Sequence, residues 1–161
     1  MKREDEVLDA VSKEDTVKLR ELAGHYSDEA AIHQEEALIK LAMITYCFHK
    51  IFIKLHMRQK TEALVEHTLK KLAQKDYDSI IGELVEFDRE HGLFEGGLVD
   101  KARIKIASRL HSRGISVAQS AGVTGARVSD IIEYFGETRG HQHVEGKSVE
   151  ERLNIARDIL Q

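Results

Sequence analysis

Apolar residues are concentrated in the segment of about residues 28–57, where they occupy nearly every face of an expected helix. They are Leu38, Ile39, Leu41, Met43, Ile44, Phe48, Ile51, Phe52, Ile53 and Leu55. A helix that is hydrophobic all round is buried all round. We therefore expect one long helix, either as the central helix of a bundle or as part of a dimer interface. Ser12 with Asp15, and Ser27 before Asp28, are expected helix starts, since hydroxyls cap unpaired N–H groups and acids favour the first turn.

Two stretches downstream are apolar on one face only, at the spacing of an amphipathic helix. They cover about residues 61–74 and 77–91. Their stripe positions are Leu64, Val65, Leu69 and Leu72 in the first stretch and Ile80, Ile81, Leu84, Val85 and Phe87 in the second. We expect both helices to complete an N-terminal bundle.

A glycine-rich stretch follows these helices. Its glycines are Gly92, Gly96 and Gly97. Because glycine clusters mark loops, we place a boundary between two units here. We predict an all-α fold with a helical bundle at 1–92 and a C-terminal module at 98–161. The bundle is expected to dimerise or to sense a ligand. The charge changes at the same place: residues 1–96 hold 14 Lys or Arg against 20 Asp or Glu, whereas residues 97–161 hold 10 against 8. With a net charge of −4, any nucleic-acid binding must come from the local charge distribution.

Four cations lie four residues apart directly after this boundary. They are Lys101, Lys105, Arg109 and Arg113. The apolar positions of the same stretch are Val99, Ala102, Ile106 and Leu110. This spacing predicts one helix over about residues 99–113 with the cations along a single ridge. The ridge is either an edge that contacts nucleic-acid phosphates or a solvated face that pairs in part with the acidic bundle.

Residues 114–133, GISVAQSAGVTGARVSDIIE, resemble the helix-turn-helix pattern of the large bacterial and archaeal regulator families. Ala118 stands where two helices cross closely and a small side chain is needed, and Gly122 stands where the tight turn usually requires a positive φ. Thr124 is expected to cap the second helix. The apolar positions that hold the two helices together are Val117, Ala121, Val123, Val128 and Ile131.

The resemblance implies that the second helix enters the major groove of DNA with its N-terminal residues against base edges. Thr124, Arg127 and Ser129 suit that task, because hydroxyls and guanidinium groups bind base edges or phosphate. Asp130 and Glu133 do not, because they place carboxylates near a polyanion. The four cations of the preceding helix would then supply most of the affinity. The candidate nucleic-acid-binding residues are Lys101, Lys105, Arg109, Arg113, Thr124, Arg127 and Ser129.

The end of the chain is expected to close this module. Residues 137–147 read as a polar loop or a wing-like linker, and Ser148 with Glu151 matches a capping box. A final helix is expected at about 149–160. The order of basic helix, helix-turn-helix, short loop and closing helix is similar to C-terminal modules of uncharacterised archaeal proteins, and this similarity brings no biochemical activity with it.

The histidines were weighed as metal ligands. The one cluster in a predicted loop is His141 and His143, with Glu137 and Glu145 nearby. Zinc sites need three or four ligands in fixed geometry, and a pair flanked by glycines does not predict one. The histidines of the long helix segment, His33, His49 and His56, are expected to be satisfied polar groups at the edges of the bundle. We expect neither a metal nor another cofactor.

The case for an enzyme is poor. Arg20 and His25 have the Arg-x4-His spacing of HEPN-type ribonucleases, but in that family the motif belongs on a late helix of the bundle. No phosphate-binding glycine loop and no nucleophile elbow is present. Cys47 is the only cysteine and is expected to pack as a small hydrophobic residue. Charges within the apolar segment and the absence of a secretory signal favour a cytoplasmic protein rather than a membrane protein.

Two functions remain. The first is a DNA-binding transcriptional regulator, a homodimer through the apolar long helix, because paired half-sites multiply the few base contacts of one module. The second is a non-enzymatic adaptor whose helix-turn-helix fold binds a protein partner. Asp130 and Glu133 discriminate between the two, since a change to Lys should strengthen DNA binding in the first case and break partner binding in the second.

Overall fold

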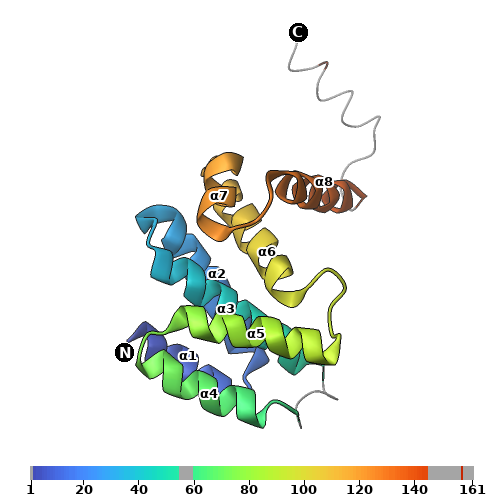
Figure 1. Ribbon diagram of the computed structural model, residues 1–161. Coiled ribbons are helices and arrows are strands. Elements are labelled where there is room, and N and C mark those ends of the chain that lie inside the picture. The colour runs from blue at the N-terminus through green and yellow to red at the C-terminus, as the bar shows by residue number, and fades with distance from the viewer. Residues whose placement is uncertain (1, 55–59, 145–156, 158–161) are drawn as a thin grey trace.

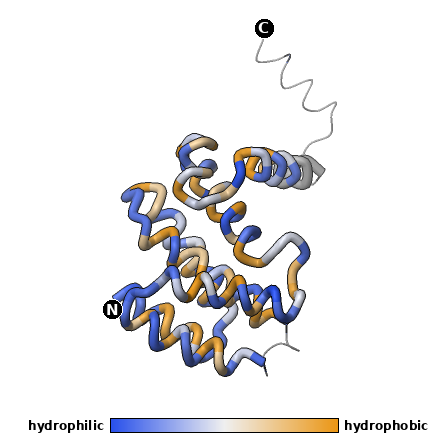
Figure 2. Tube along the Cα trace, in the orientation of Figure 1, coloured by the Kyte–Doolittle hydropathy of each residue, from blue (hydrophilic) through white to orange (hydrophobic). Residues whose placement is uncertain are grey.

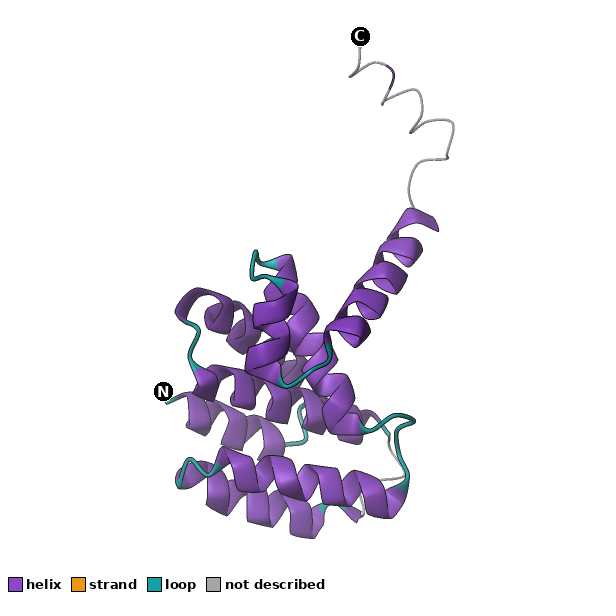
Figure 3. Cartoon of the chain, turned by 45° about the horizontal axis from the view of Figure 1, so that its top comes forward, coloured by secondary structure: helices purple, strands orange, loops and turns teal. Residues whose placement is uncertain are grey.

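The structure, a computed structural model, describes residues 2–54, 60–144 and 157, with side chains up to residue 137 and at 157. This part of the chain contains eight helices and no strand, which confirms the predicted all-α class (Figures 1 and 3). The helices are α1 (Arg3–Ser12), α2 (Thr16–His33), α3 (Glu36–Ile53), α4 (Glu62–Ala73), α5 (Tyr77–His91), α6 (Leu98–Ser112), α7 (Val117–Thr124) and α8 (Val128–Val144). None of the described helices combines the length and the apolar character needed to cross a membrane.

The expected single helix at 28–57 is wrong, because the chain reverses between α2 and α3. Gln34 adopts the left-handed conformation, φ 51°, and its N–H donates to the carbonyl oxygen of Ala30 at 2.8 Å, which ends α2. Ser27 is not a helix start: it lies inside α2, buried, and its hydroxyl donates to the carbonyl of Ala23 at 2.6 Å. The start expected from Ser12 with Asp15 is confirmed for Asp15 alone: its carboxylate accepts from the N–H of Lys18 at 3.0 Å, whereas Ser12 ends α1 and its hydroxyl donates to the carbonyl of Asp9 at 3.0 Å.

Helix α3 is the centre of the bundle, and α1, α2, α5 and α6 pack around it. Most of its apolar residues, Leu38 and Ile44 among them, are buried within the chain, whereas Ile53 at its end is 51% exposed. Hydrophobic and hydrophilic positions alternate along the surrounding helices, as amphipathic packing requires (Figure 2). Of the two alternatives for the long apolar segment, the structure therefore shows the central helix. A homodimer remains a prediction, and it would have to use a different surface.

Helices α4 and α5 agree with the two predicted amphipathic stretches. Leu64, Leu72, Ile80, Leu84 and Phe87 are buried. The exception among the stripe positions is Val85, which is 47% exposed. Hydrophobic periodicity was sufficient to predict these two helices, because each of them buries one face against the bundle.

The glycine-rich loop leads directly back into the core. Gly92, with φ 56°, ends α5, and Asp88 of α5 accepts a hydrogen bond from the N–H of Leu98 at 2.8 Å, at the first residue of α6. The apolar side of α6 belongs to the same hydrophobic cluster as α2, α3 and α5. Its members in α6 are Leu98, Val99, Ala102, Ile106 and Leu110. Residues on both sides of the predicted boundary thus share one core.

Helices α6, α7 and α8 meet around a second, smaller cluster. It consists of Ala107, Ala121 and Ile131, with Val117 and Ala126 packed against it. Helix α8 continues to Val144, so the loop expected from residue 137 is wrong over 137–144. Its far end projects beyond the other helices (Figure 3). The predicted capping box at Ser148 and the helix at 149–160 lie outside the described residues, apart from Arg157.

Candidate nucleic-acid interface

The connection between α7 and α8 turns at Gly125. This glycine has φ 78°, and its N–H donates to the carbonyl of Ala121 at 2.9 Å, which ends α7. Gly122, the expected turn residue, lies within α7 and has no positive φ. The prediction was therefore wrong by three residues, because a second glycine downstream meets the same conformational need.

Thr124 is not available to DNA. It is 5% exposed, and its hydroxyl donates to the carbonyl of Ser120 at 2.7 Å and accepts from the N–H of Ala126 at 3.3 Å. The residue thus stabilises the end of α7 and the connection after it. Both its expected position at the start of the second helix and its expected contact with bases are wrong.

The close crossing of the helices is made by residues other than the expected Ala118, which is exposed. Ala107 of α6 and Ser120 of α7 have no exposed surface, and Ala121 is 9% exposed. Among the expected apolar contacts, Ala121 and Ile131 are buried as predicted. Val123 and Val128 are 41% and 43% exposed, contrary to expectation.

Arg109 and Arg113, half of the predicted cation row, both bind Asp28 of α2. Arg109 donates from Nε and a terminal nitrogen to the two carboxylate oxygens, each at 2.8 Å, and Arg113 makes the same pair of bonds at 3.0 and 2.9 Å. Hydrogen bonds from Arg109, and then from Arg113, hold the pKa of Asp28 at about 2. We call these three residues the Asp28 clamp. It joins α6 to the bundle, as the solvated-face alternative anticipated.

Gly24 explains how the clamp fits against α2. A Cβ at this position would lie 3.3 Å from three atoms of the Arg109 guanidinium group. The helix therefore has a glycine where the planar guanidinium approaches its backbone.

The two lysines of the row contact aromatic residues. Lys105 donates to the hydroxyl of Tyr134 in α8 at 2.9 Å, and its ammonium lies 5.5 Å from the centre of that ring. Lys101 lies 5.9 Å from the centre of the Phe94 ring. Both lysines remain exposed. The four cations thus share a helix but belong to different local environments.

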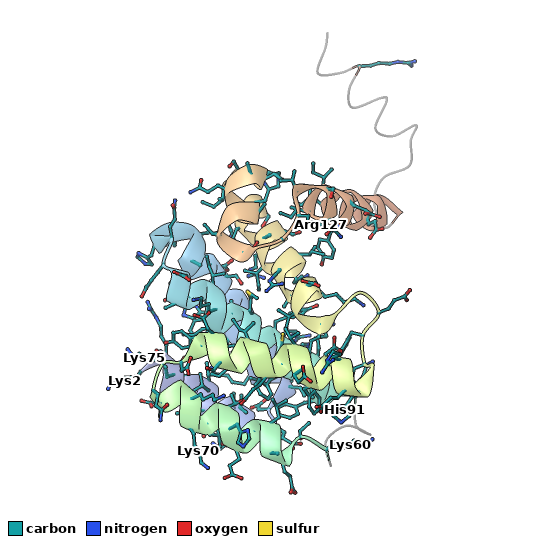
Figure 4. The ribbon with its side chains drawn as sticks, in the orientation of Figure 1. Lys2, Lys60, Lys70, Lys75, His91 and Arg127 are labelled. Atoms are coloured by element: carbon teal, nitrogen blue, oxygen red, sulfur yellow. The ribbon has the colours of Figure 1, made fainter. Side chains whose placement is uncertain are left out.

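Arg127 is the most prominent cation at the start of α8. Its side chain is 82% exposed and pairs with Asp130 at 2.9 Å, and Figure 4 shows it where α7 meets α8. Ser129 and Glu133 are also exposed. Val128 and Ile132, one helical turn apart, are 43% and 58% exposed. This end of α8 therefore offers one arginine, one hydroxyl, one carboxylate and two aliphatic side chains.

A cleft of about 430 Å³ lies between the start of α6 and the start of α8. Its cations are matched by carboxylates of the same helix region: Arg103 bonds Asp100 at 2.8 Å, and Arg127 bonds Asp130. Lys101 also lines it. We call it the paired cleft, because two of its three cations are neutralised locally.

A second cavity, of about 510 Å³, lies on another side of α6, where α2, α3 and α8 approach it. Its polar side chains include Arg20, Tyr46, His49, Lys50, Lys105 and Tyr134, and none of its described lining residues is acidic. We call it the cationic cavity. Sequence reasoning missed it because these residues come from four helices. Of its lining residues, only Lys105 and Arg109 belong to the predicted row of cations.

The histidines in the described region have ordinary structural roles. His49 is half-buried and its Nδ1 lies 2.8 Å from the carbonyl oxygen of Thr16, which confirms the expected satisfied polar group. His25 pairs with Glu29 at 3.3 Å, whereas Arg20 lines the cationic cavity. The described residues contain no group of three His, Cys, Asp or Glu side chains that could hold a metal ion. The side chains of His141 and His143 are not among those described.

Burial raises the pKa of the Cys47 thiol well above its ordinary value, which suits a packed core residue rather than a nucleophile. The chain was also compared with known proteins. No protein-family model, no curated protein and no solved structure matches it.

Proposed function

We propose that α6, α7 and α8 form a helix-turn-helix unit through which the protein binds duplex DNA as a transcriptional regulator. The observation that carries the proposal is the crossing of α7 and α8 over Ala107, Ala121 and Ile131, with a short connection that turns at Gly125. In such a unit the second helix presents its first residues to the major groove. The exposed position of Arg127 and Ser129 supports this orientation.

The charges available for DNA are fewer than the sequence suggested. The Asp28 clamp engages Arg109 and Arg113, so among the side chains that the structure describes the exposed cations near α8 are Lys101, Lys105 and Arg127. Binding through these residues would depend on few phosphate contacts, and its salt dependence would be modest because each contact contributes only about −0.9 to the log–log slope. Pairing two copies on two half-sites would compensate, through a surface other than the apolar residues of α3.

The experiment is a salt series of fluorescence anisotropy on a mixed-sequence duplex. We expect the affinity to fall by about one to two orders of magnitude between about 50 and 200 mM salt, and Arg127→Ala to reduce the log–log slope by about 1. Lys70→Ala is the matched control, because Lys70 is an exposed lysine on α4 at the opposite end of the molecule (Figure 4). Absence of binding at low salt, or an equal effect of both variants, would contradict the proposal.

A protein-interaction adaptor is the second candidate, and the exposed pair Val128 and Ile132 favours it. Aliphatic side chains one turn apart suit an apolar partner surface better than a phosphate backbone. Glu133→Lys separates the candidates, because Glu133 is exposed and its change leaves the Arg127–Asp130 pair intact. Tighter DNA binding by this variant supports the regulator, whereas unchanged, weak DNA binding favours the adaptor.

A further inference from the structure

The cationic cavity contains positive charge that the protein does not neutralise. Arg20 and Lys50 form no ion pair within the described part of the chain, and Lys105 bonds only the hydroxyl of Tyr134. Arg109 also borders the cavity, but its charge is balanced by Asp28. Three cations from three helices therefore converge on one concave surface without a carboxylate among its described lining residues.

The neutral groups of the cavity include one hydroxyl donor and one imidazole. Nδ1 of His49 donates to the carbonyl of Thr16, so Nε2 of the neutral ring is an acceptor and donates to an anion only when the ring is protonated. Burial, and then the neighbouring Tyr134, raise the pKa of Tyr46 to about 12, so its hydroxyl keeps its proton at neutral pH. Lys50 also lies 5.6 Å from the centre of the Tyr46 ring. A hydroxyl donor thus accompanies the cations on the same wall.

The volume and shape of the cavity favour a small molecule over a nucleic-acid backbone. About 510 Å³ falls within the usual range for small-ligand sites. The cavity is a hollow between helices, which suits a small ligand. The phosphates of a DNA duplex lie on a large convex surface and need an open protein surface to contact them. A guanidinium fork with two ammonium groups matches the several oxygens of a phosphate better than a single carboxylate.

We propose that the cationic cavity binds a phosphorylated small molecule, with Arg20, Lys50 and Lys105 contacting its phosphate oxygens and the hydroxyls of Tyr46 and Tyr134 contributing hydrogen bonds. The ligand class is a phosphate ester or a pyrophosphate. This site shares Lys105 with the cations proposed to contact DNA, but Arg127 and Ser129 do not line it, and its occupancy does not require DNA binding.

The test is isothermal titration calorimetry on the full chain at constant ionic strength, with pyrophosphate, ATP and adenosine as probes. We expect saturable binding of pyrophosphate and ATP and no binding of adenosine. Arg20→Ala and Lys50→Gln should each weaken binding at least about tenfold, because each removes charge-assisted hydrogen bonds. Lys18→Gln is the matched control: it removes an exposed cation from α2 outside the cavity.

Several outcomes would overturn the proposal. They are no saturable binding of either anion, retained binding by both cavity variants, or an equal loss in the Lys18→Gln control. Circular dichroism of each variant excludes loss of folding as the cause, and exposed Arg20 and half-buried Lys50 allow both variants to fold. Competition with duplex DNA is the last arm: if DNA displaces pyrophosphate and Arg20→Ala weakens both equally, the cavity binds backbone phosphates instead.

Discussion

The paired cleft and the cationic cavity lie beside α6 and have similar volumes, but they differ in whether their cations have carboxylate partners. In the paired cleft, Arg103 and Arg127 each bind an aspartate three residues away on the chain. In the cationic cavity, the cations come from separate helices, and Arg20 and Lys50 have no carboxylate partner in the described structure. Pairs three residues apart form wherever a helix forms, so they say little about function. Unpaired cations gathered by tertiary packing cost electrostatic repulsion, and a bound anion would relieve it.

The Asp28 clamp is the element that keeps this cavity from being more positive still. Asp28→Asn would leave Arg109 and Arg113 without their carboxylate beside three further cations. We expect a loss of about 1 to 2 kcal/mol in the free energy of unfolding, measured by urea denaturation at neutral pH. This is the largest stability effect that we predict, because one side chain accepts four charge-assisted hydrogen bonds.

The same variant has a defined pH signature. The pKa of Asp28 is lowered from 3.8 to about 2, so its stabilising contribution is complete above the higher value and is lost as the pH falls toward the lower one. In the Asp28→Asn variant, the free energy of unfolding should therefore change less with pH between the two pKa values than it does in the wild-type protein. Asp9→Asn is the control, because Asp9 pairs with Lys13 on an exposed helix face and should change stability by less than about 0.5 kcal/mol. Equal losses in the two variants would contradict the clamp.

Gly24 tests the approach of Arg109 to α2 more finely. Replacing an exposed helical glycine by alanine stabilises a helix by up to about 1 kcal/mol. Gly82→Ala in α5 should show this gain, because no atom lies within 4 Å of the added Cβ. Gly24→Ala should gain less, since its Cβ would press on the Arg109 guanidinium. The difference between the two variants in thermal or urea unfolding measures the contact, and identical gains would mean that Arg109 moves away without cost.

Helices that bury a single face could be predicted from the sequence, and those decided by tertiary contacts could not. The ranges of α4, α5 and α6 follow from periodicity, because the bundle confirms what the local pattern already favours. The reversal at Gln34 was missed because the left-handed residue is not a glycine and no glycine or proline marks the polar run at residues 33–36. At the α7–α8 connection two glycines three residues apart fit a tight turn, and only the packed structure selects Gly125.

The candidate site shows the same division. The exposure of Arg127 and Ser129 agrees with the sequence pattern. The burial of Thr124 does not, because the helix ends at this residue instead of beginning there. The partners of Arg109 and Arg113 lie in α2, about 80 positions away. Periodicity identifies a ridge of cations, but it does not show which distant carboxylate binds them. For the same reason it could not predict that Arg20 and Lys50 line one cavity with Lys105.

The smallest predicted effect is a shift in the titration of His49, and it reports directly on the charge in the cavity. Desolvation first, and then Lys50 and Arg20, lower its pKa from the ordinary value, against a raising effect of the Thr16 carbonyl. Lys105 and Tyr134 face the cavity from α6 and α8. Removing one cation should therefore raise the pKa of His49 only in part.

Lys50→Gln or Arg20→Ala should each raise the pKa of His49, which is measured by NMR titration of the imidazole protons. Lys18→Gln should leave it unchanged, because Lys18 does not line the cavity. Saturating pyrophosphate should raise the pKa in the wild-type protein, since an anion beside Nε2 favours the imidazolium form. A pKa that responds to neither the variants nor the anion would mean that solvent screens these cations as fully as it screens those of the paired cleft, and the contrast between the two hollows would lose its functional meaning.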